Sequence, residues 1–238
     1  MVGDIRAAWS DRSHGDLRWR TDGHRDGGAL RKFATEATGN PSGGRHLHYL
    51  RQVHGAEVLI IHETGGAAAG DDHRVRPVPD GDGMVSASPS AGLAILTADC
   101  ASIALGSEEG VFAAVHAGWR GLLGGVIEVA TAAMRDLGAT AVHGALGPTI
   151  HAECYEFSED DLASVAARYG DGIRSVTSGG RPALDVPAAV AAAFDGASVC
   201  PVAGIDVCTC CSDRYFSYRG GRDDGRQALV VWSMEESP

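Results

Sequence analysis

The chain has 238 residues, of which 44% are hydrophobic and 21% charged, so its composition is that of a globular protein with a substantial core and not of a disordered one. Its formal net charge of -11 excludes a protein that relies on a broad basic surface, and we expect no nucleic-acid partner. No apolar run reaches the roughly 18 residues that a membrane-spanning helix needs, and no apolar signal segment follows Met1, so we expect a cytoplasmic protein with no membrane partner.

The first half of the chain predicts one helix and several short strands. Residues 1–45 are polar and glycine-rich, and within them only residues 29–37 carry the apolar spacing of a helix. Short apolar and β-branched runs then predict strands at residues 56–62, 92–97, 103–105 and 111–116. Residues 107–110 have the composition of a hairpin turn, and the many Gly, Pro and Asp residues of 64–83 predict a long loop.

The second half of the chain mixes helices with strands. Apolar residues at helical period predict a helix from Gly121 to a C-cap at Gly138. Two further helices are predicted at residues 159–169 and 186–194, the second capped by Asp185. Strands are predicted at residues 142–146 and 227–232. Because helices and strands intermix without strict β-α-β alternation, we expect an α+β fold in a single domain of residues 1–238.

Three segments place metal-binding side chains at the ends of predicted strands. His54 immediately precedes one strand, Cys100 follows another, and His116 ends a third. Two neutral imidazoles and one thiolate suit zinc or copper far better than magnesium or calcium. Three protein ligands leave a fourth tetrahedral position open, as in catalytic zinc sites, where the metal activates water. Asp99, beside Cys100, is a candidate to orient a ligand or to move protons.

The same residues also have plainer interpretations. Their spacing matches no compact zinc finger, so His54 alone is typical of a structural or surface histidine, and Cys100 alone of a buried thiol. Cys100 and His116 also fit a cysteine nucleophile with a histidine base. Six cysteines in a long chain without a signal favour reduced thiols. The three cysteines within residues 208–211 lack distant partners at zinc-like spacing, which is more typical of structural thiols than of a metal cluster.

A series of longer motifs occurs in order over roughly residues 50 to 232. They are Arg51-Gln52-Val53-His54-Gly55, Thr97-Ala98-Asp99-Cys100, His116-Ala117-Gly118-Trp119-Arg120-Gly121, Gly147-Pro148-Thr149-Ile150, Cys154-Tyr155-Glu156-Phe157, Cys208-Thr209, Tyr215-Phe216-Ser217-Tyr218-Arg219 and Gly225-Arg226. With these motifs the chain resembles the YfiH-like laccase-domain family, also labelled polyphenol oxidoreductase. The resemblance implies a layered α/β/β/α sandwich with mixed sheets.

The resemblance also implies a site. The metal would be zinc, with copper as the alternative, and its ligands would be His54, Cys100 and His116. Beside these ligands, the candidate catalytic residues are Asp99, Cys100 and Arg120, and the candidate substrate contacts are Gln52, Asp82, Arg120, Tyr155, Arg219 and Arg12, of which only Arg12 is carried over from the family pattern. Structural alternatives stay open for four of them: an ion pair for Arg120, a turn for Asp82, the core for Tyr155 and an aromatic strand for Arg219. A guanidinium near a helix start, such as that of Arg120, is suited to hold phosphate. Residues 1–45 depart from the family pattern, which affects Arg12 most.

From the resemblance we expect a metal-dependent purine nucleoside phosphorylase that acts on adenosine, inosine and methylthioadenosine and that also deaminates adenosine. Its partners would be small molecules, a purine nucleoside and phosphate. Three alternatives stay open: an amidase-like hydrolase that edits peptidoglycan precursors, a copper-dependent polyphenol oxidase, and a metal-binding protein without catalysis. The chain lacks the several His-x-His pairs of a multicopper cluster, which disfavours the oxidase. The sequence predicts no oligomeric state.

Overall fold

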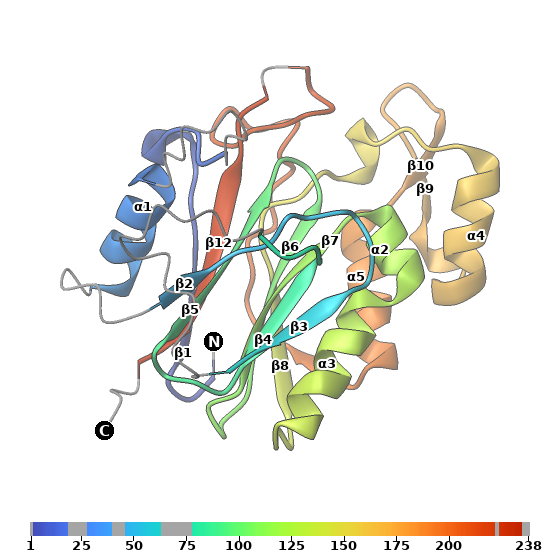
Figure 1. The fold of residues 1–238 in the computed structure, drawn as a ribbon. Helices are drawn as coiled ribbons and strands as arrows, with labels where there is room; N and C mark the ends of the chain where they lie inside the picture. The colour runs from blue at the N-terminus through green and yellow to red at the C-terminus, as the bar shows by residue number, and fades with distance from the viewer. Residues whose placement is uncertain (1, 19–27, 40–45, 63–77, 222–223, 235–238) are drawn as a thin grey trace.

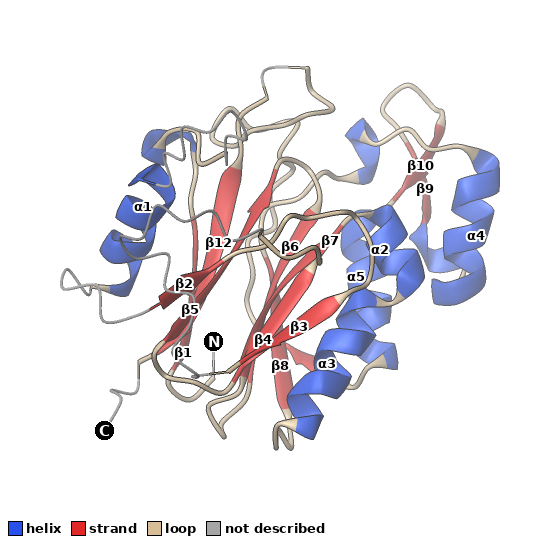
Figure 2. Ribbon diagram, in the orientation of Figure 1, coloured by secondary structure: helices blue, strands red, loops and turns tan. Residues whose placement is uncertain are grey.

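Two β-sheets lie face to face in the middle of the molecule, and helices cover their outer faces (Figures 1 and 2). The computed structural model describes residues 2–18, 28–39, 46–62, 78–221 and 224–234. Most of the loop predicted at residues 64–83 therefore lies outside the described residues. The layers agree with the expected α/β/β/α sandwich of the α+β class, so that prediction is confirmed.

The larger sheet has six strands and is mixed. Across the sheet they are β11 (Val199–Pro201), β8 (Val142–Leu146), β6 (Ala101–Gly106), β7 (Phe112–Ala117), β4 (Gly83–Ser86) and β3 (Val58–Ile61). The two outer pairs, β11 with β8 and β3 with β4, are parallel, and the inner pairs are antiparallel. The expected turn at residues 107–110 joins β6 to β7, and Gly110 adopts a φ of 83° there.

The smaller sheet has four strands. They are β1 (Ile5–Trp9), β12 (Gln227–Ser233), β5 (Ala91–Thr97) and β2 (His46–His48). A separate two-stranded pair, β9 (Arg174–Val176) with β10 (Pro182–Leu184), lies at the periphery beside α4 (Figure 1). The chain passes from β5 in the smaller sheet to β6 in the larger one within residues 98–100, so this short link joins the two sheets.

Alternation along the strands creates three apolar layers. In β7, Phe112 and Ala114 face the other sheet, whereas Ala113 and Val115 face the helices. In β12, alternate residues pack between the sheets and against α1, and all seven are buried. Each fully buried large aliphatic side chain contributes roughly 1.5–3 kcal/mol. Each sheet is covered on one face by the other sheet and on the other face by helices. This is why the strands appear in the sequence as continuous apolar runs.

Five α-helices occur in the described part of the chain. They are α1 (Gly28–Thr38), α2 (Trp119–Gly124), α3 (Val126–Asp136), α4 (Glu159–Tyr169) and α5 (Val186–Gly196). The first covers the smaller sheet, and α2, α3 and α5 cover the larger one (Figure 1). Three short 3-10 helices add single turns at η1 (Arg12–His14), η2 (Ala152–Cys154) and η3 (Asp171–Ile173).

The sequence patterns do not predict the short strands β2, β4, β9, β10 and β11. Two further elements also differ from the sequence prediction. The single helix expected from Gly121 to Gly138 is divided into α2 and α3 at Gly125, whose φ of 80° lies in the left-handed region that favours glycine. The strand β1 was not predicted, because Ile5–Trp9 carries an arginine and two alanines; its pairing with β12 stabilises it instead. In the part of the chain that the structure describes, no helix has the length and hydropathy to cross a bilayer.

The expected cap of α5 is present and gives a test of the fold. The Ala188 backbone N–H donates to Asp185 Oδ1 at 2.9 Å. Asp185→Ala is expected to lower the free energy of unfolding by about 1 kcal/mol, because a helix N–H loses its acceptor. Urea denaturation measures the difference. Asp195→Ala, at an exposed position of the same helix, is the control and should stay within about 0.5 kcal/mol of the parent; equal effects of the two changes would contradict the cap.

Candidate metal and substrate site

His54, Cys100 and His116 meet although they come from three different parts of the chain. His54 lies in the loop before β3, Cys100 in the link from β5 to β6, and His116 near the end of β7. One ligand atom from each lies within 4.8 Å of those of the other two. The two imidazole rings meet edge to face, with centroids 4.9 Å apart. The structure thus brings together the three residues that the sequence singled out as metal ligands.

Two of the segments that carry these side chains have unusual backbone conformations. His54 has a φ of 61° and Asp99, next to Cys100, a φ of 92°. Positive φ at residues other than glycine costs on the order of 1–3 kcal/mol and persists only where neighbouring contacts hold it. The carbonyl of Asp99 accepts hydrogen bonds from Thr149 Oγ1 at 2.6 Å and from the Ile150 N–H at 2.9 Å. These contacts hold the link that presents Cys100.

A single buried carboxylate, that of Asp82, holds both histidines. Its Oδ1 lies 2.8 Å from His116 Nδ1, which leaves Nε2 of that ring for the site. The same oxygen accepts from the His54 backbone N–H at 2.9 Å, and Oδ2 accepts from the Gly55 N–H at 2.6 Å. Burial alone would raise the pKa of Asp82, but the hydrogen bonds and the charge of His116 lower it below its usual value. Asp82 is therefore an anion with both oxygens occupied.

Two glycines allow the site segments to approach one another. A Cβ at Gly118 would lie 3.1 Å from His54 Cδ2 and 3.3 Å from Cys100 Sγ, so a side chain there would crowd two of the three candidate ligands. A Cβ at Gly121, in α2, would lie 2.9 Å from the backbone oxygen of Gly55. Close contact between α2 and the His54 loop therefore requires glycine at this position.

Cys100 and His116 shift each other's proton equilibria. Burial would raise the pKa of the Cys100 thiol, but the charge of His116 and hydrogen bonds with both imidazoles lower it to about 6. Burial would lower the pKa of His116, but the Cys100 thiolate and Asp82 raise it to about 9. Without a metal, the pair therefore exists near neutral pH as a thiolate and an imidazolium.

The donor set fits a single soft or borderline divalent metal. Two imidazole nitrogens and a thiolate are the ligands that zinc prefers, at about 2.0–2.3 Å, and copper accepts the same set. Metal-binding histidines usually donate the N–H of their other ring nitrogen to a carboxylate, a backbone carbonyl or water, and Asp82 occupies that position on His116. His116 and Asp82 are buried, so the protein side of the site, away from the cavity, excludes water. The residues present therefore fit a metal with three protein ligands and an open fourth position.

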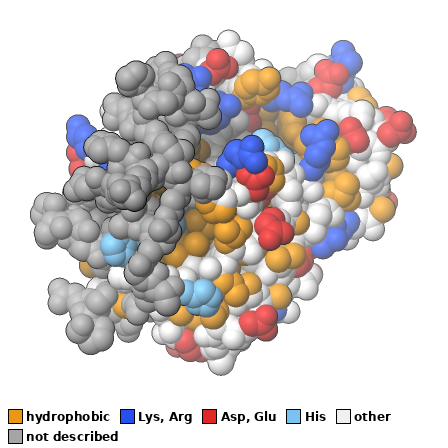
Figure 3. Space-filling view, viewed as in Figure 1, with side chains coloured by type: hydrophobic (Ala, Val, Ile, Leu, Met, Phe, Trp, Pro, Cys, Tyr) orange, Lys and Arg blue, Asp and Glu red, His pale blue; other side chains and the backbone are white. Residues whose placement is uncertain are grey.

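A cavity of about 1150 Å³ opens from these residues. His54, Cys100 and His116 line it together with apolar and aromatic side chains such as Leu96 and Trp119. Five arginines also line it, and Asp99 is the one acidic residue among the described lining residues; the arginines are Arg18, Arg51, Arg120, Arg219 and Arg226. Figure 3 shows basic side chains on the rim of a hollow on this face. The cavity is thus strongly basic within a chain of net charge -11.

Arg120, Tyr155 and Arg219 lie on the cavity wall, as their predicted roles require. The guanidinium of Arg120 lies 4.4 Å from the ring centroid of Trp119, and that of Arg219 lies 4.9 Å from the ring of Tyr155. Burial, followed by the charge of Cys100, raises the pKa of Tyr155 to about 12, so its phenol stays protonated. These three residues can contact a molecule in the cavity.

Asp99 and Gln52 line the cavity, but their polar atoms bond to the protein. Asp99 Oδ1 accepts from Thr209 Oγ1 at 2.7 Å, and Oδ2 accepts from the Arg219 backbone N–H at 2.6 Å. The amide of Gln52 donates to the Leu96 carbonyl at 2.7 Å and accepts from its N–H at 2.9 Å. Asp99 therefore connects the link between β5 and β6 to residues 209 and 219, and Gln52 connects the His54 loop to β5. The prediction that Asp99 orients a histidine differs from the geometry, in which Asp82 makes that contact.

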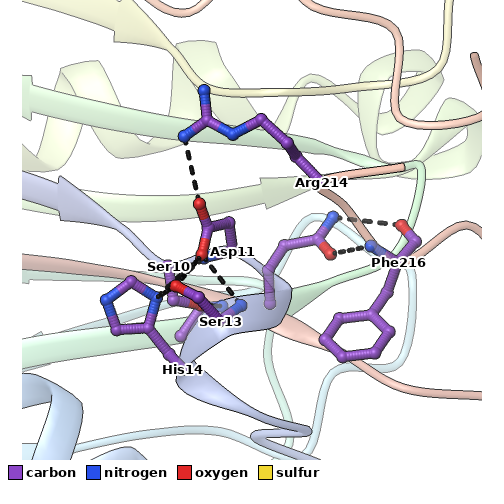
Figure 4. A network of polar contacts seen from close by, with 8 residues as sticks. Ser10, Asp11, Ser13, His14, Arg214 and Phe216 are labelled. Carbon is purple, nitrogen blue, oxygen red and sulfur yellow. Dashed lines mark hydrogen bonds and ion pairs between the residues drawn. The ribbon is translucent and has the colours of Figure 1, made fainter. Parts of the chain in front are cut away.

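The predicted substrate contacts Asp82 and Arg12 do not reach the cavity. Asp82 is fully buried behind the histidines. Arg12 donates to the Tyr215 carbonyl at 2.9 Å and lies over the ring of Phe216. In the same region Asp11 contacts Arg214 and His14 (Figure 4). Arg12 and Asp11 thus attach the N-terminal segment to the loop that leads to Arg219.

Sequence reasoning missed several residues of the site. Arg18, Arg226 and Trp119 line the cavity. Arg226 and Trp119 belong to family motifs but are not predicted as site residues, and Arg18 belongs to no motif. The contact of Asp82 with His116 follows from strand register: Gly83 in β4 pairs with Val115 in β7, which places the preceding and following residues side by side. No local pattern shows that register.

Comparison with known proteins adds family and fold. A family model described as "Multi-copper polyphenol oxidoreductase laccase" matches residues 21–234. A protein of Streptomyces coelicolor named purine nucleoside phosphorylase is 41% identical over 187 residues, 77% of this chain and 74% of that protein. A Streptomyces griseus protein of the same name is 37% identical over 190 residues, 79% of this chain and 74% of that protein.

Solved structures share the fold. YlmD from Geobacillus stearothermophilus aligns with a TM-score of 0.81 at 23% identity, over 98% of this chain and 93% of that one. The Bacillus licheniformis hypothetical protein YfiH aligns with a TM-score of 0.81 at 18% identity, over 96% of this chain and 92% of that one. At these identities the likeness concerns the fold alone.

The thiolate of Cys100 gives the first test of the site. In metal-free protein the alkylation rate of Cys100 by iodoacetamide is expected to rise through pH of about 6 and to level off near pH 7, because a lowered pKa leaves the thiolate present above that pH and removes it below. Peptide mass spectrometry measures the rate, with exposed Cys200 as the reference for reagent loss. A rate that rises only above pH of about 8 would contradict the thiolate–imidazolium pair.

The carboxylate of Asp82 gives the second test. Asp82→Asn is expected to weaken zinc binding about 10–100-fold, because an amide cannot accept all the hydrogen bonds that orient His116 and the His54 loop. Competition with a chromophoric chelator measures the affinity. Asp80→Asn is the matched control, since Asp80 lies two residues away but pairs with exposed Arg51. Equal affinities of the two variants would remove Asp82 from the site.

Proposed function

The chain belongs to the family described as multi-copper polyphenol oxidoreductase laccase, and from this membership, its phosphorylase-named relatives and its basic cavity we propose that it is a purine nucleoside phosphorylase. The family description indicates copper-dependent oxidation, whereas the names of the relatives indicate phosphorolysis. We therefore compare the residues of the cavity with the needs of each reaction. A multicopper centre needs more histidines than His54 and His116, the two among the described lining residues. The donor set suits one metal beside an anion-binding cavity.

The charge of the cavity carries the proposal. Among the described lining residues, five arginines and one acidic residue form a positive region in an otherwise acidic protein, and three of these arginines form no carboxylate pair with a described residue. Such a cleft raises the local concentration of anions and steers them inward. Inorganic phosphate and the sugar phosphate that phosphorolysis yields are both anions of suitable size. A phenol would gain nothing from this charge.

Arg120 and Arg219 are the arginines that we assign to phosphate. Among the described residues, no carboxylate pairs with either guanidinium, whereas Arg51 pairs with Asp80 and Arg18 with Asp16. Each guanidinium lies over an aromatic ring, which keeps its planar fork ordered and leaves its N–H groups available. Arginine forks bind phosphate oxygens through paired hydrogen bonds.

The reaction places three demands on these residues. A phosphate oxygen attacks C1′ of the ribose, the bond from C1′ to the purine nitrogen breaks, and its electron pair leaves with the base, which then takes up a proton. Phosphate must therefore be held near C1′, the base must be oriented, and water must be kept away. Arg120 and Arg219 meet the first demand. Tyr155, protonated at neutral pH, is assigned as a neutral hydrogen-bond donor to the nucleoside.

The remaining residues position this machinery. A divalent metal, zinc in our proposal, held by His54, Cys100 and His116 would supply positive charge beside the atoms that become negative as the bond breaks. Asp82 fixes the orientation of His116. Asp99 fixes the backbone of Arg219 and is thus a positioning residue rather than a proton carrier.

Adenosine deamination is the finer part of the proposal. Water adds to C6 of adenine, the C6–N bond breaks, ammonia leaves with a proton from the water, and the water oxygen remains on the ring; this reaction would use the metal-binding triad but not the phosphate. The same cavity contains the triad and the aromatic side chains that a purine would contact. Product analysis in the absence of phosphate separates the two activities.

One observation favours a second candidate function. The thiolate of Cys100 beside the imidazolium of His116 is the state that a cysteine nucleophile uses to attack an amide. A hydrolase that removes a wrongly placed amino acid from a peptidoglycan precursor would use this pair without a metal. Cleavage of such an amide by metal-free protein, with adenosine unchanged by the metal-loaded protein, would favour this alternative.

The main test is phosphorolysis by the zinc-loaded protein. Adenosine with phosphate is expected to yield adenine and ribose 1-phosphate, and adenosine without phosphate to yield inosine if the deaminase proposal holds. Chromatography follows all products. Cys100→Ala is expected to abolish both reactions, since it removes one of three metal ligands. Absence of adenine with phosphate would refute the phosphorylase.

The role of Arg120 has its own test. Arg120→Ala is expected to raise KM for phosphate about 10–100-fold, because a charged hydrogen-bonding partner is worth roughly 1.5–3 kcal/mol. Deamination without phosphate should change much less. Arg174→Ala is the control, because Arg174 pairs with Asp171 and lies outside the cavity. An unchanged KM for phosphate would remove Arg120 from the phosphate site.

A further inference from the structure

A second group of metal-capable side chains lies outside the cavity. It consists of Glu153, Cys154, Cys208 and Cys211, which each place one ligand atom within 4.8 Å of the others. Cys154 belongs to η2, and the other two cysteines to a turn more than fifty positions later. The fold thus supplies the distant partner that the cysteines of residues 208–211 lack in the sequence. None of the four residues lines the cavity of the first site.

The distances in this group suit a shared ion. Cys154 Sγ and Cys211 Sγ are 3.3 Å apart, and Cys211 Sγ lies 3.6 Å from Glu153 Oε1. Sulfurs bound to one tetrahedral zinc at about 2.3 Å lie about 3.8 Å apart. Small side-chain adjustments therefore bring these atoms to zinc geometry. A disulfide requires about 2.05 Å, and the cysteines are free thiols.

The backbone around Cys208 supports a thiolate ligand. The His151 N–H donates to Cys208 Sγ at 3.4 Å, a contact of the kind that stabilises sulfur ligands around metals. Thr149 and Cys208 form a parallel bridge, and the Thr209 N–H donates to the Thr149 carbonyl at 3.0 Å. The segment of Thr149 and His151, which leads to Cys154, and the segment of Cys208 are therefore held side by side without an ion.

We propose that Cys154, Cys208, Cys211 and Glu153 form a second, structural zinc site. Three thiolates and one carboxylate complete a tetrahedron, so the site is closed and has no position for substrate. Thiolates select zinc over magnesium or calcium. Cys210 neighbours this group but is not needed for four-coordination.

The place of this site in the fold suggests what it stabilises. The turn of residues 208–212 leads into the segment that carries Arg219, and Thr209 within it donates to Asp99 beside the first site. A zinc ion between η2 and this turn would fix one wall of the cavity. Zinc binding contributes directly to folding free energy where the site closes only in the folded chain.

Metal content and stability test the proposal. Purified wild-type protein loaded with zinc and desalted is expected to hold two ions per chain, Cys100→Ala one, Cys211→Ser one, and the double variant none; elemental analysis measures them. Chelation of the Cys100→Ala protein should lower its thermal midpoint. Cobalt loaded into that protein should give the strong thiolate-to-metal absorption of several sulfur ligands.

The control is Cys200→Ser, an exposed cysteine in β11, which should still hold two ions. Because Cys211 is exposed, its replacement should leave the fold intact, and circular dichroism checks this. If the Cys100→Ala protein holds no zinc after loading and desalting, the proposal is overturned. A disulfide between Cys154 and Cys211, found by mass spectrometry of the freshly purified chain, would also overturn it.

Discussion

The hydrogen bonds of one buried carboxylate connect the fold to the site. Asp82 accepts from the backbone of the His54 loop and from the ring of His116. A buried anion is stable only when hydrogen bonds and opposite charge compensate for lost hydration. The same contacts that stabilise Asp82 therefore determine where two of the three candidate metal ligands point.

The two sheets give the site its third member and its cavity. Cys100 lies where the chain crosses from the smaller sheet to the larger one, and Asp99 beside it is tied to Thr209 and to the Arg219 backbone. Asp99, a candidate proton carrier by its sequence position, thus connects the end of the cavity with the candidate metal ligands to an arginine on its wall. The candidate metal ligand Cys100 and the arginine that we assign to phosphate, Arg219, therefore share one structural support.

Local elements could be predicted from the sequence, and long-range contacts mostly could not. The helix at residues 159–169 and the cap Asp185 follow from period and capping chemistry, which are local. The motifs predict that His54, Cys100 and His116 converge, whereas the position of Asp82 depends on the register of β4 against β7. The partnership of Cys154 with Cys211 likewise arises from tertiary packing between two distant segments. β1 was missed because pairing, not composition, stabilises it.

The central claim is that three distant segments share one ion at the end of a basic cavity. Crystals of the zinc-loaded protein, measured on both sides of the zinc absorption edge, test it most directly. The account predicts an anomalous peak bonded to a nitrogen of His54, the sulfur of Cys100 and Nε2 of His116 at about 2.0–2.3 Å. Density for zinc only elsewhere, with the three side chains in direct contact and no ion between them, would contradict it.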